Sequence, residues 1–295
     1  MKQHLKGSLT LILATIIWGS TFVAQSVGVE KIGPFSFLAI RSMLAVLFLL
    51  LVLFITKRKE FVKIITNPRL WKAGIPCGIA LFAATGFQQV GLIYTTAGKA
   101  GFITTMYIVL VPIFGMFIKR KPPKTVGISV ILAAIGLYLI SGAGVQSINI
   151  GDVLMLCCAV AFAVQILIVD RVAGELDAIA FNISQALVCS VISGIVMLFT
   201  EEVVVADVLS CWFPLCYAGI LSMGVAYTLQ IVGQKSLEPT TASLLMSFES
   251  VFAAISGWLL LNEHFTLTEG IGCILVFGAI ILTQIPVKDA KKAPV

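Results

Sequence analysis

Long, continuously apolar runs follow one another along almost the whole chain, separated by short polar segments. Each run approaches the roughly 20 residues that a helix needs to cross a bilayer core of about 30 Å. Apolar and polar residues do not alternate within the runs, which favours membrane-spanning helices over the strands of a membrane barrel. The pattern predicts an all-α membrane protein with ten transmembrane helices. We expect them at about residues 9–29, 35–56, 73–94, 100–118, 125–143, 153–169, 178–200, 211–234, 240–261 and 270–287.

Lysine and arginine are distributed very unequally over the loops that these ten helices would create. Of the 20 Lys and Arg residues, 17 fall on one side of the membrane, whereas Lys31 and Lys99 fall on the other and Arg41 lies within a helix. Positive residues are retained in cytoplasmic loops, so both termini are predicted to be cytoplasmic. The loops at 146–151 and 201–210 are therefore expected outside.

The composition argues against several classes of protein. Hydrophobic residues make up 59% of the 295 residues and charged residues only 12%, about half the charged share of a soluble domain. A water-soluble fold cannot bury so much apolar surface, which disfavours a soluble enzyme, a nucleic-acid-binding protein and a disordered chain. The net charge of +6 is then informative through its distribution, because the side on which the positive residues fall indicates the orientation in a membrane. The first apolar run is expected to be a retained helix, because it can span and no small-residue cleavage site follows it.

The two halves of the chain resemble each other at a shift of about 141–144 residues. Gly78 aligns with Gly219 and Gln89 with Gln230 at one common shift. Each half would hold five helices, and an odd number inverts the second half relative to the first. The chain is thus predicted to consist of two inverted-topology repeats, residues 1–145 and 146–295, an architecture suited to alternating access.

Several short motifs stand at the ends and in the middle of the predicted helices. In the first half they are Trp18-Gly19-Ser20, the segment 94–100 (YTTAGKA) and Val111-Pro112; in the second half they are Leu237-Glu238-Pro239, Glu249, Asn262-Glu263 and the pair Gly270 and Gly278. Together they resemble the EamA-type transporters of the drug/metabolite transporter superfamily over essentially the whole chain. Two positions depart from that family's usual pattern: Ser250 stands where Pro often follows the intramembrane Glu, and Lys121 stands where an acid is common. The resemblance implies two five-helix repeats and the export or uptake of small organic metabolites.

Glu249 is the only acidic residue well inside a predicted helix. Placing a charge at the bilayer centre costs about 2.5–3.5 kcal/mol on insertion scales. Three roles are open to it: it binds a cationic group of the substrate, it carries a proton, or it is a protonated structural residue that bonds another helix. Its aligned partner in the first half is Tyr107, so the acid and the tyrosine would make a central cavity asymmetric.

Four more residues complete the predicted substrate site. Gln89 and Gln230 share helix faces with glycine and other small residues, and an amide can both donate and accept a hydrogen bond. Trp18 in the first helix would supply an aromatic wall, with Gln165 near the matched place in the sixth helix. An aromatic wall beside an acid suits an amino acid, an amine or an aromatic metabolite. The alternative is that these side chains only bond neighbouring helices.

These features predict a secondary transporter of the cytoplasmic membrane that moves a small organic metabolite by alternating access, with export favoured. Expected partners are the substrate, membrane lipids and protons, with no nucleic acid, metal or cofactor. No G-x-x-x-x-G-K-[ST] loop occurs, so ATP hydrolysis is not expected. Arg41 is expected to snorkel outwards, with pairing to Glu249 as the alternative. The rival functions are a lipid or polyprenyl-carrier flippase and an intramembrane enzyme. The enzyme is disfavoured because His4 and His264 both lie near surfaces.

Overall fold

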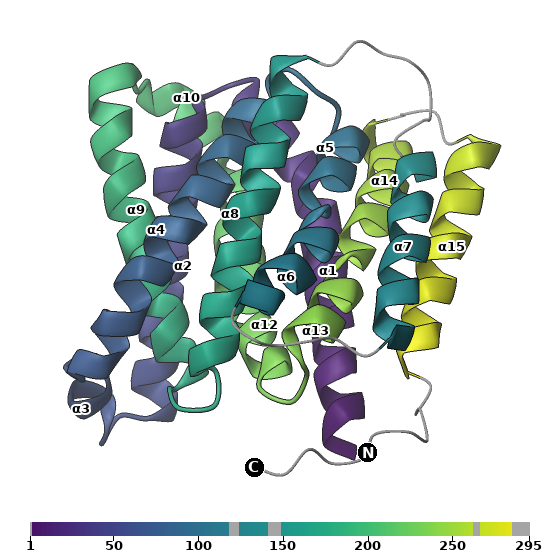
Figure 1. Ribbon diagram of the computed structural model, residues 1–295. Coiled ribbons are helices and arrows are strands. Elements are labelled where there is room, and N and C mark those ends of the chain that lie inside the picture. Colours follow the sequence, from purple (N-terminus) through teal and green to yellow (C-terminus); the bar gives the residue numbers. More distant parts are fainter. Residues whose placement is uncertain (1, 118–123, 141–148, 262–265, 285–295) are drawn as a thin grey trace.

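The computed structural model describes residues 2–117, 124–140, 149–261 and 266–284. The regular structure in these segments is helical, and the long helices run alongside one another as a bundle (Figure 1). The helices are α1 (Lys2–Val29), α2 (Pro34–Thr56), α3 (Phe61–Ile65), α4 (Pro68–Gly91), α5 (Ala97–Thr104), α6 (Tyr107–Phe117), α7 (Lys124–Ile140), α8 (Ile150–Val172), α9 (Ala178–Thr200), α10 (Val205–Ser210), α11 (Trp212–Cys216), the π-helix η1 (Tyr217–Ala226), α12 (Tyr227–Gln234), α13 (Pro239–Met246), α14 (Phe248–Leu261) and α15 (Leu267–Gln284).

Eight helical stretches in the described segments are long and apolar enough to cross a membrane. They coincide with eight of the ten predicted runs. The other two runs correspond to α7 and α15, whose apolar parts are the shorter stretches Gly127–Leu139 and Gly270–Ala279. The predicted ends at 141–143 and 285–287, like the motif Asn262-Glu263, lie outside the described residues. The chain is therefore a helical protein with several candidate membrane spans, and the count of ten stays a prediction.

Sequence signals for helix starts explain several boundaries. Pro34, Pro68 and Pro239 are the first residues of α2, α4 and α13, where the missing N–H leaves no hydrogen bond unmade. Asn149 and Asp152 form a reciprocal capping box at the start of α8, which satisfies two backbone N–H groups that have no partner within the helix. These local choices set where each apolar run begins.

Three of the candidate spans are irregular near their midpoints. Thr105 and Met106 separate α5 from α6, and Ser247 separates α13 from α14. The third consists of α11, η1 and α12, with wider π-helical turns in its middle. Asn182 on α9 donates to the backbone oxygens of Met223 (3.0 Å) and Gly224 (2.9 Å) in η1. This side chain supplies partners to carbonyl groups in the π-helical segment, where the usual helix pattern is interrupted.

Helix packing depends on close backbone approach at glycine. α2 packs on α9, α4 on α8 and α9, α7 on α15, and α1 on η1, α12 and α14. A Cβ atom at Gly78 would lie 2.8 Å from the backbone oxygen of Gln185 in α9. A Cβ atom at Gly219 would lie 2.8 Å from the backbone oxygen of Arg41 in α2. Any larger residue at these two positions would force the helices apart.

The two ends of the bundle carry different charge. Figure 1 places α3, the start of α1 and the turn between α12 and α13 at one end, called here the α3 end, and α10 at the opposite α10 end. The α3 end carries Lys57, Arg58, Lys59 and Lys63 in and beside α3, together with Lys235, which directly follows α12. Among the described residues the α10 end carries Lys31, just before α2, and Lys99, in the first turn of α5.

Candidate functional site

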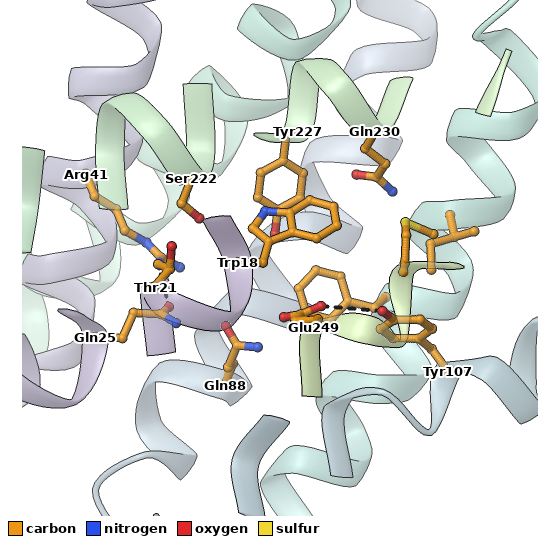
Figure 2. A pocket seen from close by; sticks show the side chains of 13 residues that line it. Trp18, Thr21, Gln25, Arg41, Gln88, Tyr107, Ser222, Tyr227, Gln230 and Glu249 are labelled. Carbon is orange, nitrogen blue, oxygen red and sulfur yellow. Dashed lines mark hydrogen bonds between the residues drawn. The ribbon is translucent and has the colours of Figure 1, made fainter. Parts of the chain in front are cut away.

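A cavity lies inside the bundle, between α1, α2, α4, α6, α8, η1, α12, α13 and α14 (Figure 2). Its walls combine aromatic rings, amides, hydroxyl groups, one acid and one arginine. The lining residues are Trp18, Thr21, Gln25, Arg41, Gln88, Tyr107, Phe162, Ile166, Ser222, Tyr227, Gln230, Met246 and Glu249.

The two spans that are divided into separate helices, α5–α6 and α13–α14, each contribute a residue close to the break to this cavity. Tyr107 is the first residue of α6, and Glu249 is the second residue of α14. The Tyr107 hydroxyl donates to Glu249 Oε2 at 3.4 Å, which joins the two spans across the cavity wall. The ring of Phe162 packs on Tyr107 with centroids 6.4 Å apart and the planes at 71°. The two positions that the sequence alignment paired therefore meet in space.

Trp18 and Tyr227 form an aromatic wall opposite this pair. Their ring centroids are 5.0 Å apart in an edge-to-face arrangement. The Trp18 side chain is buried, and its indole Nε1–H has no hydrogen-bond partner among the described residues. A buried polar group without a partner is uncommon and calls for an explanation. This donor belongs to a residue of the cavity wall.

Arg41 lies in the same cavity, contrary to the expectation that it snorkels outwards. Only 3% of the residue is exposed. Its Nη1 donates to Gln25 Oε1, and its guanidinium stands 5.7 Å from the centre of the Phe37 ring. Its Nε has no hydrogen-bond partner in the part of the chain that the structure describes. Pairing with Glu249 is not observed either, since no acid among the described residues lies within ion-pair distance of Arg41. Packing of α2 against η1 and α9 holds this side chain inside the bundle.

The glutamines of the predicted site divide between the cavity wall and the layer behind it. Gln230 lines the cavity and exchanges hydrogen bonds with Gln165 at 3.0 and 3.5 Å. Gln165 is fully buried behind the wall and also donates to Gln185 Oε1 at 3.2 Å. Gln89 is not among the lining residues; it is fully buried and donates to the backbone oxygen of Gln25 at 3.4 Å. Its neighbour Gln88 lines the cavity instead, so Gln89 lies outside this wall, and a role of Gln89 in substrate binding stays a prediction.

Sequence reasoning missed Ser222 and Tyr227, which also line the cavity. Tyr227 stands three residues before Gln230 in the regular helix α12, so helical spacing could have found it. Ser222 lies in η1, whose π-helical turns change the rotation between successive residues, and no pattern in the sequence signals that change. Gln88, in contrast, was detectable as the second amide of an adjacent pair.

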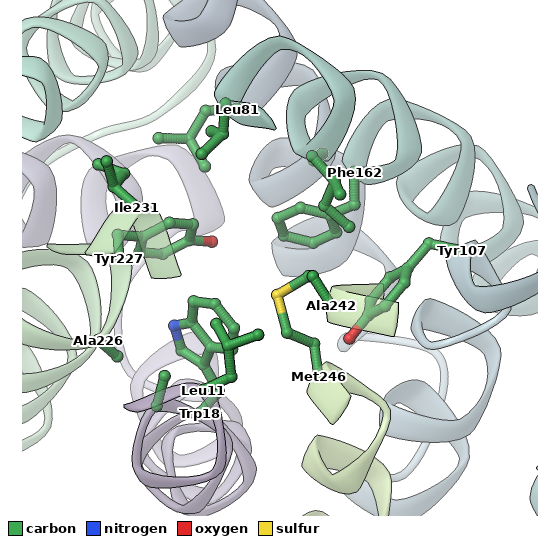
Figure 3. Packing of buried hydrophobic residues seen from close by; sticks show 14 of the residues in the cluster. Leu11, Trp18, Leu81, Tyr107, Phe162, Ala226, Tyr227, Ile231, Ala242 and Met246 are labelled. Atoms are coloured by element: carbon green, nitrogen blue, oxygen red, sulfur yellow. The ribbon is translucent and has the colours of Figure 1, made fainter. Parts of the chain in front are cut away.

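An apolar layer closes the cavity towards the α3 end. Figure 3 shows Leu11, Ile231 and Ala242 in the buried cluster beside Trp18 and Tyr227. These three residues are at most 1% exposed. Leu11 and Ala242 lie one or two helical turns nearer the α3 end than Trp18 and Met246 on the same helices, and Ile231 directly follows the cavity residue Gln230. The polar wall residues on α2 and near the end of α4 lie towards the α10 end, so the polar part of the cavity is displaced in that direction.

A model of the EamA-like transporter family matches residues 5–142 and 149–285, and the chain belongs to this family of membrane transporters. A relative from Archaeoglobus fulgidus, named an uncharacterized transporter, is 32% identical over 97% of this chain and 88% of its own length. YoaV from Bacillus subtilis, also named an uncharacterized transporter, is 24% identical over 94% of this chain and 96% of its own. One crystal structure superimposes with a TM-score of 0.78 over 94% of this chain and 96% of the other, at 18% identity. That likeness shows the fold alone.

Proposed function

We propose that this protein is a secondary transporter of the cytoplasmic membrane that moves a small organic metabolite through the central cavity, with export as the direction. The observation that carries the proposal is a cavity with polar groups at mid-depth, between two interrupted helices, closed by apolar packing at one end. Transporter sites of this kind are built where helices are discontinuous near the bilayer midplane. The substrate, the surrounding lipids and protons are the proposed partners.

Ten helices in two inverted repeats are the architecture we propose for this cavity. Under this layout α2 and α9 are the second helices of the two halves and pack together, as do the fifth helices α7 and α15. The packing of α4 on α8 has its counterpart in that of α12 on α1. The helix breaks also fall at aligned positions, before Tyr107 and before Glu249. Exchange of equivalent contacts between such halves is what alternating access requires.

The α3 end is proposed to face the cytoplasm, because Lys and Arg gather there. The polar side of the cavity would then lie towards the outside, and the layer of Leu11, Ile231 and Ala242 would form the inner barrier. Labelling tests this orientation. In a variant without the native cysteines, a cysteine introduced at Asp207 in α10 should react with an impermeant maleimide added to intact cells. Reaction only after the membrane is opened contradicts the orientation.

Release from proteoliposomes tests the transport function itself. Vesicles that contain the purified protein are loaded with radiolabelled amino acids, amines, sugars or nucleosides, and the release rate is compared with that of protein-free vesicles. At least one class should leave faster. Ser222→Phe, which fills the cavity, should abolish the excess release, whereas Ser210→Phe at the exposed end of α10 should retain it. Release of no class above the protein-free rate, or full activity of Ser222→Phe, contradicts the proposal.

A further inference from the structure

The segment between α2 and α4 gathers positive charge on the surface of the bundle. It includes α3, and residues 57–72 hold six of the 20 Lys and Arg residues of the chain against one acid, Glu60. All of these charged side chains are exposed. In the described part of the chain, only Lys57 among the six forms an ion pair. An anion from outside the protein can therefore reach the other five, which are Arg58, Lys59, Lys63, Arg69 and Lys72.

Contacts on both sides hold this segment against the bundle. The ring of Phe61 in α3 packs edge-to-face on Phe54 in α2, with centroids 5.6 Å apart. On the other side, the indole N–H of Trp71 in α4 donates to the backbone oxygen of Ile65 at the end of α3, at 2.8 Å. Phe61, Ile64 and Ile65 also pack against the buried core. The basic residues of the segment therefore belong to one ordered surface, residues 57–72, called here the α3 surface.

The matching segment in the second half of the chain carries the opposite charge. At the shift that aligns Gly78 with Gly219, residues 57–72 correspond to residues 198–213. That segment also forms a short helix, α10, which follows α9 at the opposite end of the bundle (Figure 1). It contains three acids and no Lys or Arg. A short connecting helix at this place in the fold thus needs no basic residues, so folding alone does not account for the charge of the α3 surface.

Exposed apolar residues accompany the positive charge. The α3 surface lies between the candidate spans Pro34–Thr56 and Pro68–Gly91, at one end of both. Ile55 and Val62, at this end, are each 70% exposed. Where a protein meets a membrane surface, apolar side chains contact the acyl chains and nearby cations are attracted to anionic lipid headgroups. Apolar and positive side chains together fit a phospholipid better than a soluble anion, which offers no acyl chain.

We propose that the α3 surface binds the headgroup of an anionic phospholipid in the adjoining leaflet. Lys63, Arg69 and Lys72 supply positive charge to the phosphate, and the planar fork of Arg69 can bind two of its oxygens. Ile55 and Val62 contact the acyl chains. With the orientation proposed above, this lipid lies in the cytoplasmic leaflet. The inference goes beyond the proposed transport function and does not depend on the substrate.

Lipid binding by the purified protein in a nonionic detergent tests the inference. Native mass spectrometry compares phosphatidylglycerol with phosphatidylcholine of the same acyl chains, and thermal unfolding gives the lipid concentration needed for half-maximal stabilisation. Phosphatidylglycerol should bind more tightly, and added NaCl should weaken its binding, because salt screens exposed charges. Glycerol 1-phosphate, the headgroup chemistry without acyl chains, should not raise the unfolding temperature. Equal binding of the two lipids, or equal stabilisation by glycerol 1-phosphate, overturns the inference.

Substitutions on the α3 surface locate the lipid. Lys63→Gln/Arg69→Gln/Lys72→Gln should weaken phosphatidylglycerol binding at least about tenfold, because each basic residue adds to the attraction of an anionic surface. Lys63→Arg/Arg69→Lys/Lys72→Arg keeps the charge and should retain most of the binding. Size-exclusion profiles show whether each variant is folded. The single variants Lys63→Gln and Lys72→Gln should give smaller losses, and they decide the matter if the neutral triple variant does not fold.

The matched control is Lys6→Gln/Arg171→Gln/Lys235→Gln. It also removes two lysines and one arginine, from exposed positions outside the α3 surface, and should bind phosphatidylglycerol as wild type does. Unchanged binding in the folded neutral variants of the α3 surface, or an equal loss in this control, overturns the inference. Binding is measured without transport, so such a result leaves the proposed function standing, and a failure to transport any compound leaves the lipid site standing.

Discussion

The described charged residues inside the bundle differ from Lys57 and Lys99 at its ends in whether they form ion pairs. At the ends, Lys57 pairs with Asp177 at 2.5 Å, and Lys99 pairs with Asp152 at 2.8 Å. Inside, Arg41 and Glu249 line one cavity, yet neither lies within ion-pair distance of an opposite charge among the described residues. The Lys57 side chain is 42% exposed, so an unpaired charge there would cost little, whereas pairing would be worth most in the interior.

Under the proposed function, this difference separates charges that hold the structure from charges that are available to a substrate. An internal pair of Arg41 and Glu249 would offset part of the cost of burying both groups. It would also leave neither group available to a substrate. Unpaired interior charges of this kind are costly for the empty protein, as at other functional sites in membranes.

The largest expected effect comes from removing the negative charge of Glu249. Glu249→Gln keeps the size of the side chain and an acceptor for Tyr107 but loses the charge. If Glu249 binds a cationic group of the substrate, uptake should fall at least about tenfold at every pH. If it carries a proton, the response to an imposed pH gradient should disappear instead. Tyr107→Phe, which removes only the 3.4 Å hydrogen bond, should have a smaller effect. Wild-type rate, specificity and pH profile in Glu249→Gln would leave the acid with a structural role.

A carboxylate placed beside Arg41 should remove the difference between unpaired interior charges and paired charges at the ends. Gln25 already accepts from its guanidinium, so Gln25→Glu should create an ion pair at nearly unchanged geometry. The variant should unfold at a higher temperature than wild type. It should transport its substrate several-fold more slowly, because the new carboxylate pairs with the guanidinium of Arg41 and leaves it unavailable. Gln25→Met lacks an acceptor and adds no charge, so it separates the effect of the new charge from the effect of losing the amide. Faster uptake by Gln25→Glu would contradict a role of Arg41 in transport.

A moderate effect on stability, with transport retained, is expected at the α10 end. The Asp152 carboxylate accepts a hydrogen bond from the Lys99 ammonium group and another from the backbone N–H of Asn149. Asp152→Ala should lower the free energy of unfolding by about 1–2 kcal/mol, because a capping contact and a largely buried ion pair are lost together. Lys99→Gln, which removes only the ion pair, should cost less. Thermal unfolding in detergent measures both, and equal losses would show that the cap contributes nothing.

The smallest effect is expected at the α3 end. The hydrogen bond to Asp177 and its negative charge raise the pKa of Lys57. A raised pKa means that the pair stabilises the fold below the unfolded value for lysine, about 10.4, and that this stability is lost as the pH rises through the higher folded value. Asp177→Asn keeps the N-cap of α9 and should cost under about 1 kcal/mol at pH 8, since Lys57 is 42% exposed and well solvated. At pH 12 the difference should vanish; a persistent difference would point to the cap.

Much of the architecture and part of the site follow from local sequence. Continuous apolar runs account for the eight candidate spans, and Pro34, Pro68 and Pro239 mark helix starts. Among the six residues predicted for the site, Trp18, Tyr107, Gln230 and Glu249 line the cavity, whereas Gln165 and Gln89 lie behind it. Their roles in binding remain predictions. Polar residues deep within apolar runs can be recognised without a structure, because lipid is a poor solvent for them.

Tertiary packing alone decided the direction in which the remaining side chains point. An arginine seven residues into α2 can snorkel or turn inwards, and the contact of α2 with η1 and α9 turns Arg41 towards the cavity. The choice of Gln88 over Gln89 depends on the rotation of α4 against its neighbours, and Ser222 reaches the wall from the π-helical turns of η1. Sequence determined which residues are polar at depth, since that is a property of each residue. The structure determined which of them share a cavity, since rotation and register arise from contacts between distant segments.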